Sequence, residues 1–174
     1  MKYFYLFLGA TLFYPSLVLA ATATSTTSVV VSDVLRVGPN VTISESVSRD
    51  TLLLGGDIQI NSAVAGDVLA AGGNIAINAP VAGDVRVVGG QITINSQVGG
   101  NVTVAGGQIS FGPMSEVAGS VGAWAGQVRI AGTVSGDVYV QTGKGENLKI
   151  DPNAVIAGTL TYKAETANPA LVSG

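Results

Sequence analysis

The chain has 174 residues, of which 47% are apolar and 11% charged, and its formal net charge is −3. This composition is too apolar for a disordered chain, and it lacks the clustered basic residues that nucleic-acid binding requires. The absence of cysteine and histidine excludes disulfides, thiolate zinc sites, the Ser-His-Asp triad and the commonest general base.

The first twenty residues, MKYFYLFLGATLFYPSLVLA, carry one lysine, then an apolar run, and end in the small-x-small pattern Val18-Leu19-Ala20. This order is typical of a secretory signal peptide. We therefore expect export to the periplasm, the cell envelope or the outside of the cell, with residues 1–20 removed. The run is long enough for one alternative, in which residues 3–20 stay attached as a membrane anchor.

Three further segments follow the expected signal peptide. Residues 21–29 are rich in alanine, threonine and serine and show no periodicity, which predicts a flexible linker. Residues 30–162 share one repeated pattern and are expected to form a single domain. Residues 163–174 fall outside that pattern and are expected to form a loose C-terminal tail.

The repeated pattern has a step of 17 residues and is aligned on the aspartate of the dipeptide Gly-Asp and on the residues that replace it. A two-residue insertion near Pro113 delays the step once, and four or five extra residues around KGENLKIDPNA delay it again. The marker column consists of Asp33, Asp50, Asp67, Asp84, Asn101, Ser120 and Asp137.

Five apolar columns keep the same step, and they include Ile58, Ile75 and Ile92 as well as Val64, Val81 and Val98. Within each unit the order is apolar, variable, apolar, which is the period-2 pattern of a strand with one buried face. Each unit thus predicts two short strands and a single valine that marks a third. Glycine pairs such as Gly72-Gly73 separate the two strands, and we expect them to adopt backbone angles that β-branched residues avoid.

Equivalent residues of such units become buried neighbours only if each coil lies parallel to the next, about 4.8 Å away. The sequence therefore predicts an all-β fold: a single parallel β-helix, or β-solenoid, of about seven 17-residue coils. Of the two hands we favour the right-handed one. The six-residue step of left-handed acyltransferase helices and the G-G-x-G-x-D motif of calcium-binding rolls are both missing.

The segment VAGDVLAAGGNIAINAPVAGDVRVVGGQITINSQVGGNV resembles the bactofilins, which are polymer-forming bacterial cytoskeletal proteins. The resemblance covers residues 30 to 162 and rests on the repeated V-x-G-D-[IV] step. It implies a compact right-handed β-helix with loose tails, head-to-tail polymerisation into filaments, frequent association with a membrane, and no bound nucleotide. Typical bactofilins are cytoplasmic, whereas this chain carries an expected export signal.

The marker column supports two interpretations. Stacked carboxylates could hold Ca²⁺ or form an acid-base pair. Aspartate also accepts hydrogen bonds from backbone N–H groups in turns, and Asn101, which interrupts the column, can do the same but is not a carboxylate. We favour a structural turn ladder, which comprises Asp50, Asp67, Asp84, Asn101 and Asp137.

Apolar residues also occupy positions between the expected inward columns. If these side chains point outward, they form an interaction face; the other interpretation places them half-buried in a bend. The face consists of Leu52, Leu54, Leu69, Val88 and Trp124.

The function that we expect is structural: a polymer-forming scaffold of the cell envelope that self-associates end to end, because a solenoid without caps leaves unpaired strands at its ends. The alternative is an exported surface module that binds a polysaccharide or a protein through the face around Trp124. We expect no catalytic activity, no cofactor, no metal, no nucleotide and no nucleic-acid partner. The expected partners are further copies of the chain, and either a membrane or cell-wall polysaccharide.

Overall fold

The computed structural model describes residues 33–143 and 147–164. The expected signal peptide (1–20), the linker (21–29) and residues 165–174 of the tail lie outside these ranges. The described residues form β1 (Val34–Ile43), β2 (Thr51–Ile60), β3 (Val68–Ile77), β4 (Val85–Ile94), β5 (Gln97–Val98), β6 (Val102–Phe111), β7 (Glu116–Val117), β8 (Val121–Ile130), β9 (Thr133–Val134), β10 (Val138–Thr142), β11 (Leu148–Ile150), β12 (Val155–Ile156) and β13 (Leu160–Ala164).

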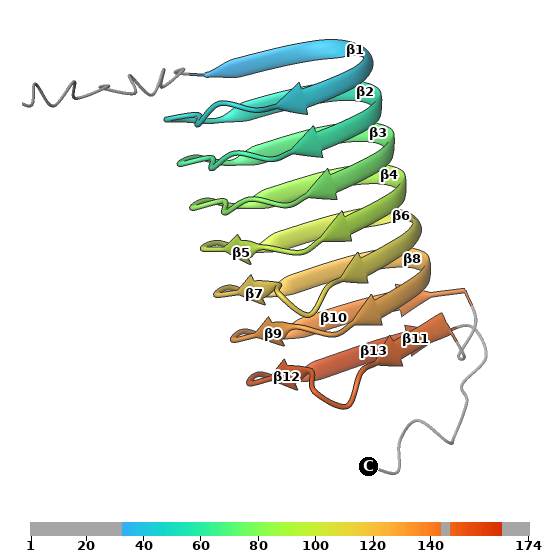
Figure 1. Cartoon of the computed structure of the whole chain (residues 1–174). Helices are drawn as coiled ribbons and strands as arrows, with labels where there is room; N and C mark the ends of the chain where they lie inside the picture. The colour runs from blue at the N-terminus through green and yellow to red at the C-terminus, as the bar shows by residue number, and fades with distance from the viewer. Residues whose placement is uncertain (1–32, 144–146, 165–174) are drawn as a thin grey trace, which may run out of the picture.

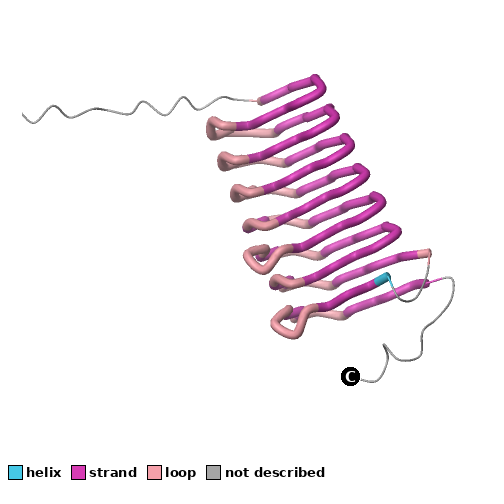
Figure 2. The backbone as a smooth tube through the Cα atoms, turned by 45° about the vertical axis from the view of Figure 1, so that its right-hand side comes forward, coloured by secondary structure: helices cyan, strands magenta, loops and turns pink. Residues whose placement is uncertain are grey.

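The strands stack into a rod in which each coil lies on the next (Figure 1). The long strands form one bent sheet in the order β1-β2-β3-β4-β6-β8-β10-β13, with β11 paired to β8. All their pairings are parallel. The sheet folds around the solenoid axis, so the first half of each long strand forms one wall and the second half another (Figure 2). The predicted parallel β-solenoid of about seven coils is confirmed.

A third wall is built from very short strands. Strands β5, β7, β9 and β12 form a second parallel sheet, and single parallel bridges continue it through Val47, Val64, Val81 and Val98. The isolated valine of each repeat does therefore mark a third strand.

The register reproduces the 17-residue step. Val68 of β3 pairs with Val85 of β4, while Val102 pairs with Val121 and Val138 pairs with Leu160. The latter two steps are longer than 17 residues because each contains an insertion. The inserted residues protrude as loops, so the strands on either side of them still pair in register. The second insertion splits the coil into β10 and β11, and Arg129 of β8 binds Asp151 just after β11 through two hydrogen bonds.

The interior is a set of continuous apolar columns. In one column Ile75, Ile92 and Ile109 are 0 to 2% exposed, and in another Val64, Val81 and Val98 are each 1% exposed. Each branched side chain covers its counterpart in the next coil, so the core extends along the whole rod without needing a second layer of structure.

Two details of the glycine corners differ from the expectation. The chain does not break into two strands there, since each ten-residue strand continues around the glycine pair. None of the described glycines has a positive φ. Glycine is needed instead because the backbones approach closely: a Cβ on Gly72 would lie 2.5 Å from the carbonyl oxygen of Gly55.

Truncating a column member should destabilise the rod. We expect Ile92→Ala to lower the free energy of unfolding by about 2–5 kcal/mol, because it leaves a cavity in a tightly packed interior. The matched control is Gln91→Ala, an exposed neighbour on the same strand, which should change stability by less than about 0.5 kcal/mol. Urea denaturation followed by circular dichroism measures both, and equal effects of the two variants would contradict the stacked core.

Candidate functional site

The marker column forms a continuous hydrogen-bond ladder along one corner of the rod. Asp50 Oδ1 accepts the backbone N–H of Asp67 at 2.8 Å, and Asp67 Oδ1 accepts that of Asp84 at 2.8 Å. Each side chain thus holds the turn of the following coil. The remaining acceptors in order are Asp84, Asn101, Ser120 and Asp137, and the last receives the N–H of Thr159.

The glycine before each ladder member from Asp67 onward follows from this geometry. A Cβ added to Gly83 would collide with Oδ1 of Asp67, and one added to Gly100 would collide with Oδ1 of Asp84. The carboxylate of one coil therefore occupies the space that a side chain of the next coil would need. This contact explains why glycine and aspartate occur together in the repeat.

Arg86 lies beside two of the ladder carboxylates. Its guanidinium contacts Asp67 at 3.1 Å and Asp84 at 2.6 Å. The pKa of Asp67 is lowered, first by the backbone hydrogen bond from Asp84 and further by Arg86. The charged form of Asp67 is consequently the one that the fold stabilises.

A second ladder follows the end of the second wall. Asn78 Nδ2 donates to Asn61 Oδ1 at 2.9 Å, and Asn95 Oδ1 accepts the backbone N–H of Met114 at 3.2 Å across the first insertion. These amides satisfy one another and the loop backbone.

The geometry of the ladders favours the structural interpretation of the marker column. Within the described ranges no three acidic side chains gather closely enough to hold a metal ion. The ladder carboxylates are held in a row by backbone donors, and each coil contributes only one of them. This geometry stabilises the turns.

The outer surface of the first wall is the part of the rod that could bind a partner. Leu52, Leu54 and Leu69 are 38 to 50% exposed, Val88 is 60% exposed and Trp124 is 43% exposed. All five members of the expected interaction face point outward, rather than being folded into a bend. Leu35 and Val37 of β1, at 67% and 70% exposed, extend this surface beyond the expected face, because they pair with Leu52 and Leu54 in the same two columns.

The face has two separate parts. We call the exposed side chains on β1 to β4 the aliphatic patch, and it comprises Leu35, Val37, Leu52, Leu54, Leu69 and Val88. We call Trp124 on β8 and Tyr139 on β10 the aromatic pair, whose ring centroids lie 5.7 Å apart at 46°. Strand β6 lies between the two parts and contributes Thr103 and Ala105 to the same columns.

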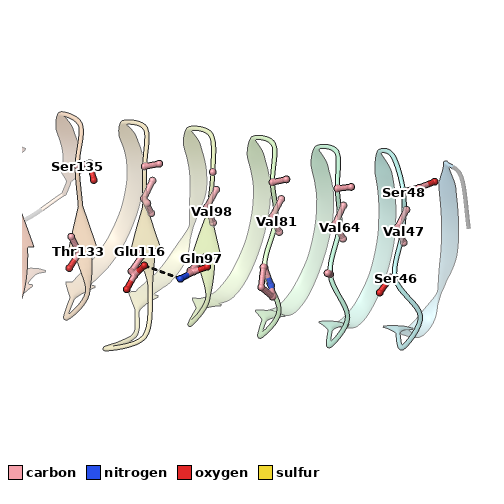
Figure 3. A pocket seen from close by; sticks show the side chains of 17 residues that line it. Ser46, Val47, Ser48, Val64, Val81, Gln97, Val98, Glu116, Thr133 and Ser135 are labelled. Atoms are coloured by element: carbon pink, nitrogen blue, oxygen red, sulfur yellow. Dashed lines mark hydrogen bonds between the residues drawn. The ribbon is translucent and has the colours of Figure 1, made fainter. Parts of the chain in front are cut away.

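The third wall carries a long shallow groove of about 830 Å³ (Figure 3). Its floor is the valine column, and its sides are small residues such as Ala63 and Ala65. Gln97 and Glu116 are joined by a hydrogen bond of 3.0 Å. The lining of the groove also includes Thr133, which pairs with Glu116 on the neighbouring strand.

No helix in the described ranges is long and apolar enough to cross a membrane. The family model described as "Bactofilin: Polymer-forming cytoskeletal" matches residues 74–172. Comparisons with curated proteins and with solved structures gave no match.

The ladder predicts different outcomes for two substitutions of Asp67. Asp67→Ala removes the acceptor for the Asp84 N–H and should lower the free energy of unfolding by about 1–3 kcal/mol at pH 7. Asp67→Asn keeps an acceptor oxygen and should cost clearly less than Asp67→Ala. Thermal unfolding at fixed protein concentration compares them, and equal losses would contradict the role of the acceptor.

The Asp67→Asn variant also separates the effect of the carboxylate charge on stability from the effect of the acceptor oxygen. Because the pKa of Asp67 is lowered on folding, the unfolded chain binds the proton first as the pH falls. The stabilisation is therefore complete above the unfolded pKa of about 4 and is lost as the pH falls through the lower folded value. Asp67→Asn should flatten this acid dependence of the wild-type stability.

Proposed function

We propose that this chain, which belongs to the bactofilin family of polymer-forming cytoskeletal proteins, is the unit of a filament whose copies join end to end. The family supports a structural scaffold role and is not an enzymatic one. The observation that carries the end-to-end contact is the pair of open sheet edges. Among the described strands, β1 pairs only with β2 and β13 pairs only with β10.

An open edge strand presents unpaired backbone N–H and C=O groups, which favour pairing with another chain. At the β13 end the apolar columns are exposed as well. Leu160 is 39% exposed and Ile150 is 41% exposed. Their partners one coil earlier, Val138 and Ile130, are 1% and 0% exposed. A further coil, supplied by another copy of the chain, would therefore bury the exposed side chains of Leu160 and Ile150.

The β1 end has a different character. Val34, Val41 and Ile43 are already 8% exposed or less. Arg36 stands in the column that Leu53, Ala70 and Val87 continue, and it is exposed. A charge that points inward at an edge strand weakens indiscriminate pairing, so this end should accept only a surface that suits the guanidinium.

The β13 end of a second copy provides such a surface. If the stack continues in register from one copy to the next, β1 takes the place after β13. In that arrangement Val34 and Arg36 of one copy would pack against Leu160 and Tyr162 of the other, because they belong to the same columns. Arginine over an aromatic ring is a favourable contact, which supports a head-to-tail arrangement. This contact joins unlike surfaces and therefore propagates as a filament.

We also propose that the filament forms outside the cytoplasm, at the cell envelope. The support is the apolar run of residues 1–20 with its small-x-small ending, the pattern of a secretory signal. A membrane-attached filament would follow if residues 3–20 were retained.

The second candidate function is that of a surface module that binds a partner through the outer face of the first wall. The observation that favours it is the exposure of Leu69, Val88 and Trp124 at 43 to 60%. The two functions are compatible, because this face runs along the rod whereas polymerisation uses its ends.

Export is tested by expressing the full chain in a bacterial host and fractionating the cells. We expect the protein in the periplasm or the medium, with an N-terminus at Ala21 by mass spectrometry. Recovery in the membrane fraction with residues 3–20 present would support the anchored form, while an uncleaved chain in the cytoplasm would contradict export.

Purified mature protein should form filaments that negative-stain electron microscopy can resolve. Leu160→Lys should abolish them and leave a folded monomer, because it puts a charge on the apolar β13 end. The matched control is Leu69→Lys, an exposed leucine on the side of the rod, which should leave the filaments intact. A wild-type protein that stays monomeric at high concentration would overturn the proposal.

Engineered cysteines identify which ends meet, because the natural chain has none. Adjacent strands bring paired Cα atoms within the distance of about 4.4–6.8 Å that a disulfide spans. In a head-to-tail filament, Leu35→Cys protein should crosslink to Thr161→Cys protein under mild oxidation, and neither should crosslink efficiently to itself. Self-crosslinking of Thr161→Cys alone would show that like ends meet.

A further inference from the structure

An open depression lies between one end of the ladder and the aromatic pair: Tyr139 lines it, and Trp124 lies beside its lining residue Gly122. Its volume is about 590 Å³, and it lies where β6, β8, β10 and β13 pass one another on the first wall. Tyr139 and Gly122 line it. The other lining groups are mostly hydroxyls and amides, from Asn101, Thr103, Ser120, Thr159 and Thr161.

The indole of Trp124 is held at the edge of this depression by a local departure from the repeat. Gly122 occupies the column in which Leu69 and Arg86 stand in earlier coils. A Cβ on Gly122 would lie 3.0 Å from the indole atom Cη2 of Trp124, so the missing side chain lets the ring lie over the strand. The ring also contacts Tyr139, whose hydroxyl donates to Gln141 at 3.1 Å.

We propose that this depression binds a neutral β-linked polysaccharide, with pyranose rings stacked on the aromatic pair. A pyranose with equatorial hydroxyls has an apolar face of C–H groups, which packs on an aromatic ring, and a polar rim, which needs hydrogen-bond partners. The depression offers both kinds of group. Trp124 supplies the platform with 43% of its surface exposed, and the hydroxyls beside it supply the partners.

Two of the hydroxyls, those of Thr103 and Thr161, are available to a ligand. Thr103, Tyr139 and Thr161 belong to one column of paired strands, and within the described ranges the hydroxyls of Thr103 and Thr161 make no hydrogen bond. Strands in a sheet are about 4.8 Å apart, which is close to the length of one pyranose unit. A glycan lying along the rod would therefore meet a hydroxyl on β6, β10 and β13, and on β8, where Gly122 has no side chain, it would meet the ring of Trp124.

Charge argues against an anionic ligand. The ring of Tyr139 has Lys163 over it at 5.7 Å, but the depression is also lined by Asp137. A nucleic acid stacked on aromatic residues would require a basic groove for its phosphates. A proline-rich peptide could also stack on the aromatic pair, and it serves as the competing ligand in the test.

Trp124 is the only tryptophan in the chain, so its fluorescence reports on this site alone. The mature full-length protein is titrated with cellohexaose and, separately, with chitohexaose. We expect a saturable blue shift with one or both, because a sugar ring removes the indole from water. Maltohexaose, whose α-linkages curve the chain, should bind more weakly, and hexaproline should not bind.

Three variants retain the fluorophore and locate the effect. Tyr139→Ala should weaken binding about tenfold or more, as loss of an aromatic hot spot does. Thr161→Val, which preserves shape, should weaken it about two- to tenfold through one lost hydrogen bond. Leu54→Ala, in the column of Trp124 but on the aliphatic patch, should leave the affinity unchanged.

The proposal is overturned if neither β-linked oligosaccharide gives a saturable change at millimolar concentration, or if hexaproline binds as tightly as they do. It is also overturned if folded Tyr139→Ala and Thr161→Val both bind like the wild type, with folding checked by circular dichroism. Glycan binding rests on the surface-module function proposed above and not on polymerisation, which electron microscopy scores independently of the fluorescence.

Discussion

The structure depends on one constraint: each coil must lie in register over the next, so that every inward side chain covers its own counterpart. The parallel pairing of β3 with β4 and of β4 with β6 places Ile75, Ile92 and Ile109 in one dry column. A coil has no interior of its own, so its stability is shared with its two neighbours. The same constraint makes the ends of the rod different from its middle, since the last coil lacks one neighbour.

The ladder satisfies the backbone N–H groups at the corners of the coils. Tight turns leave backbone N–H groups that need acceptors, and the ladder supplies one from the preceding coil each time. Asp67 accepts the N–H of Asp84 while Gly83 leaves room for the carboxylate. Each ladder residue thus binds the equivalent residue of the next coil. This contact fixes the register at the corner, while the isoleucine columns fix it in the walls.

The sequence was sufficient to predict the features that follow from the repeat. A fixed step with β-branched columns leaves few folds that bury all of them, and both insertions were visible as delays in the step. The conformation of the glycines was predicted wrongly, because a glycine needed for close backbone approach looks the same in sequence as one needed for a positive φ. Gly72 is of the first kind.

The candidate surfaces were harder to predict. Alternation showed that Leu52 and Val88 could point outward, but it could not show that Trp124 stands apart from them beside Tyr139. The ring of Trp124 lies beside Gly122, where a side chain would crowd it, and its contact with Tyr139 joins two neighbouring strands. The hydroxyls of Thr103 and Thr161 are far apart in the chain and become neighbours of one depression only through the stacking of β6, β8, β10 and β13.

In a rod of equivalent coils, residues that follow the repeat look the same in every coil, so a binding partner cannot use them to recognise one position along the axis. Specific recognition must therefore come from residues that break a column. Arg36 breaks an apolar column at the β1 end, and Gly122 with Trp124 breaks two outer columns near the other end. The first sits where copies would meet and the second where a glycan would lie. The repeat builds the rod, and these departures from it are what make its end and its side different surfaces.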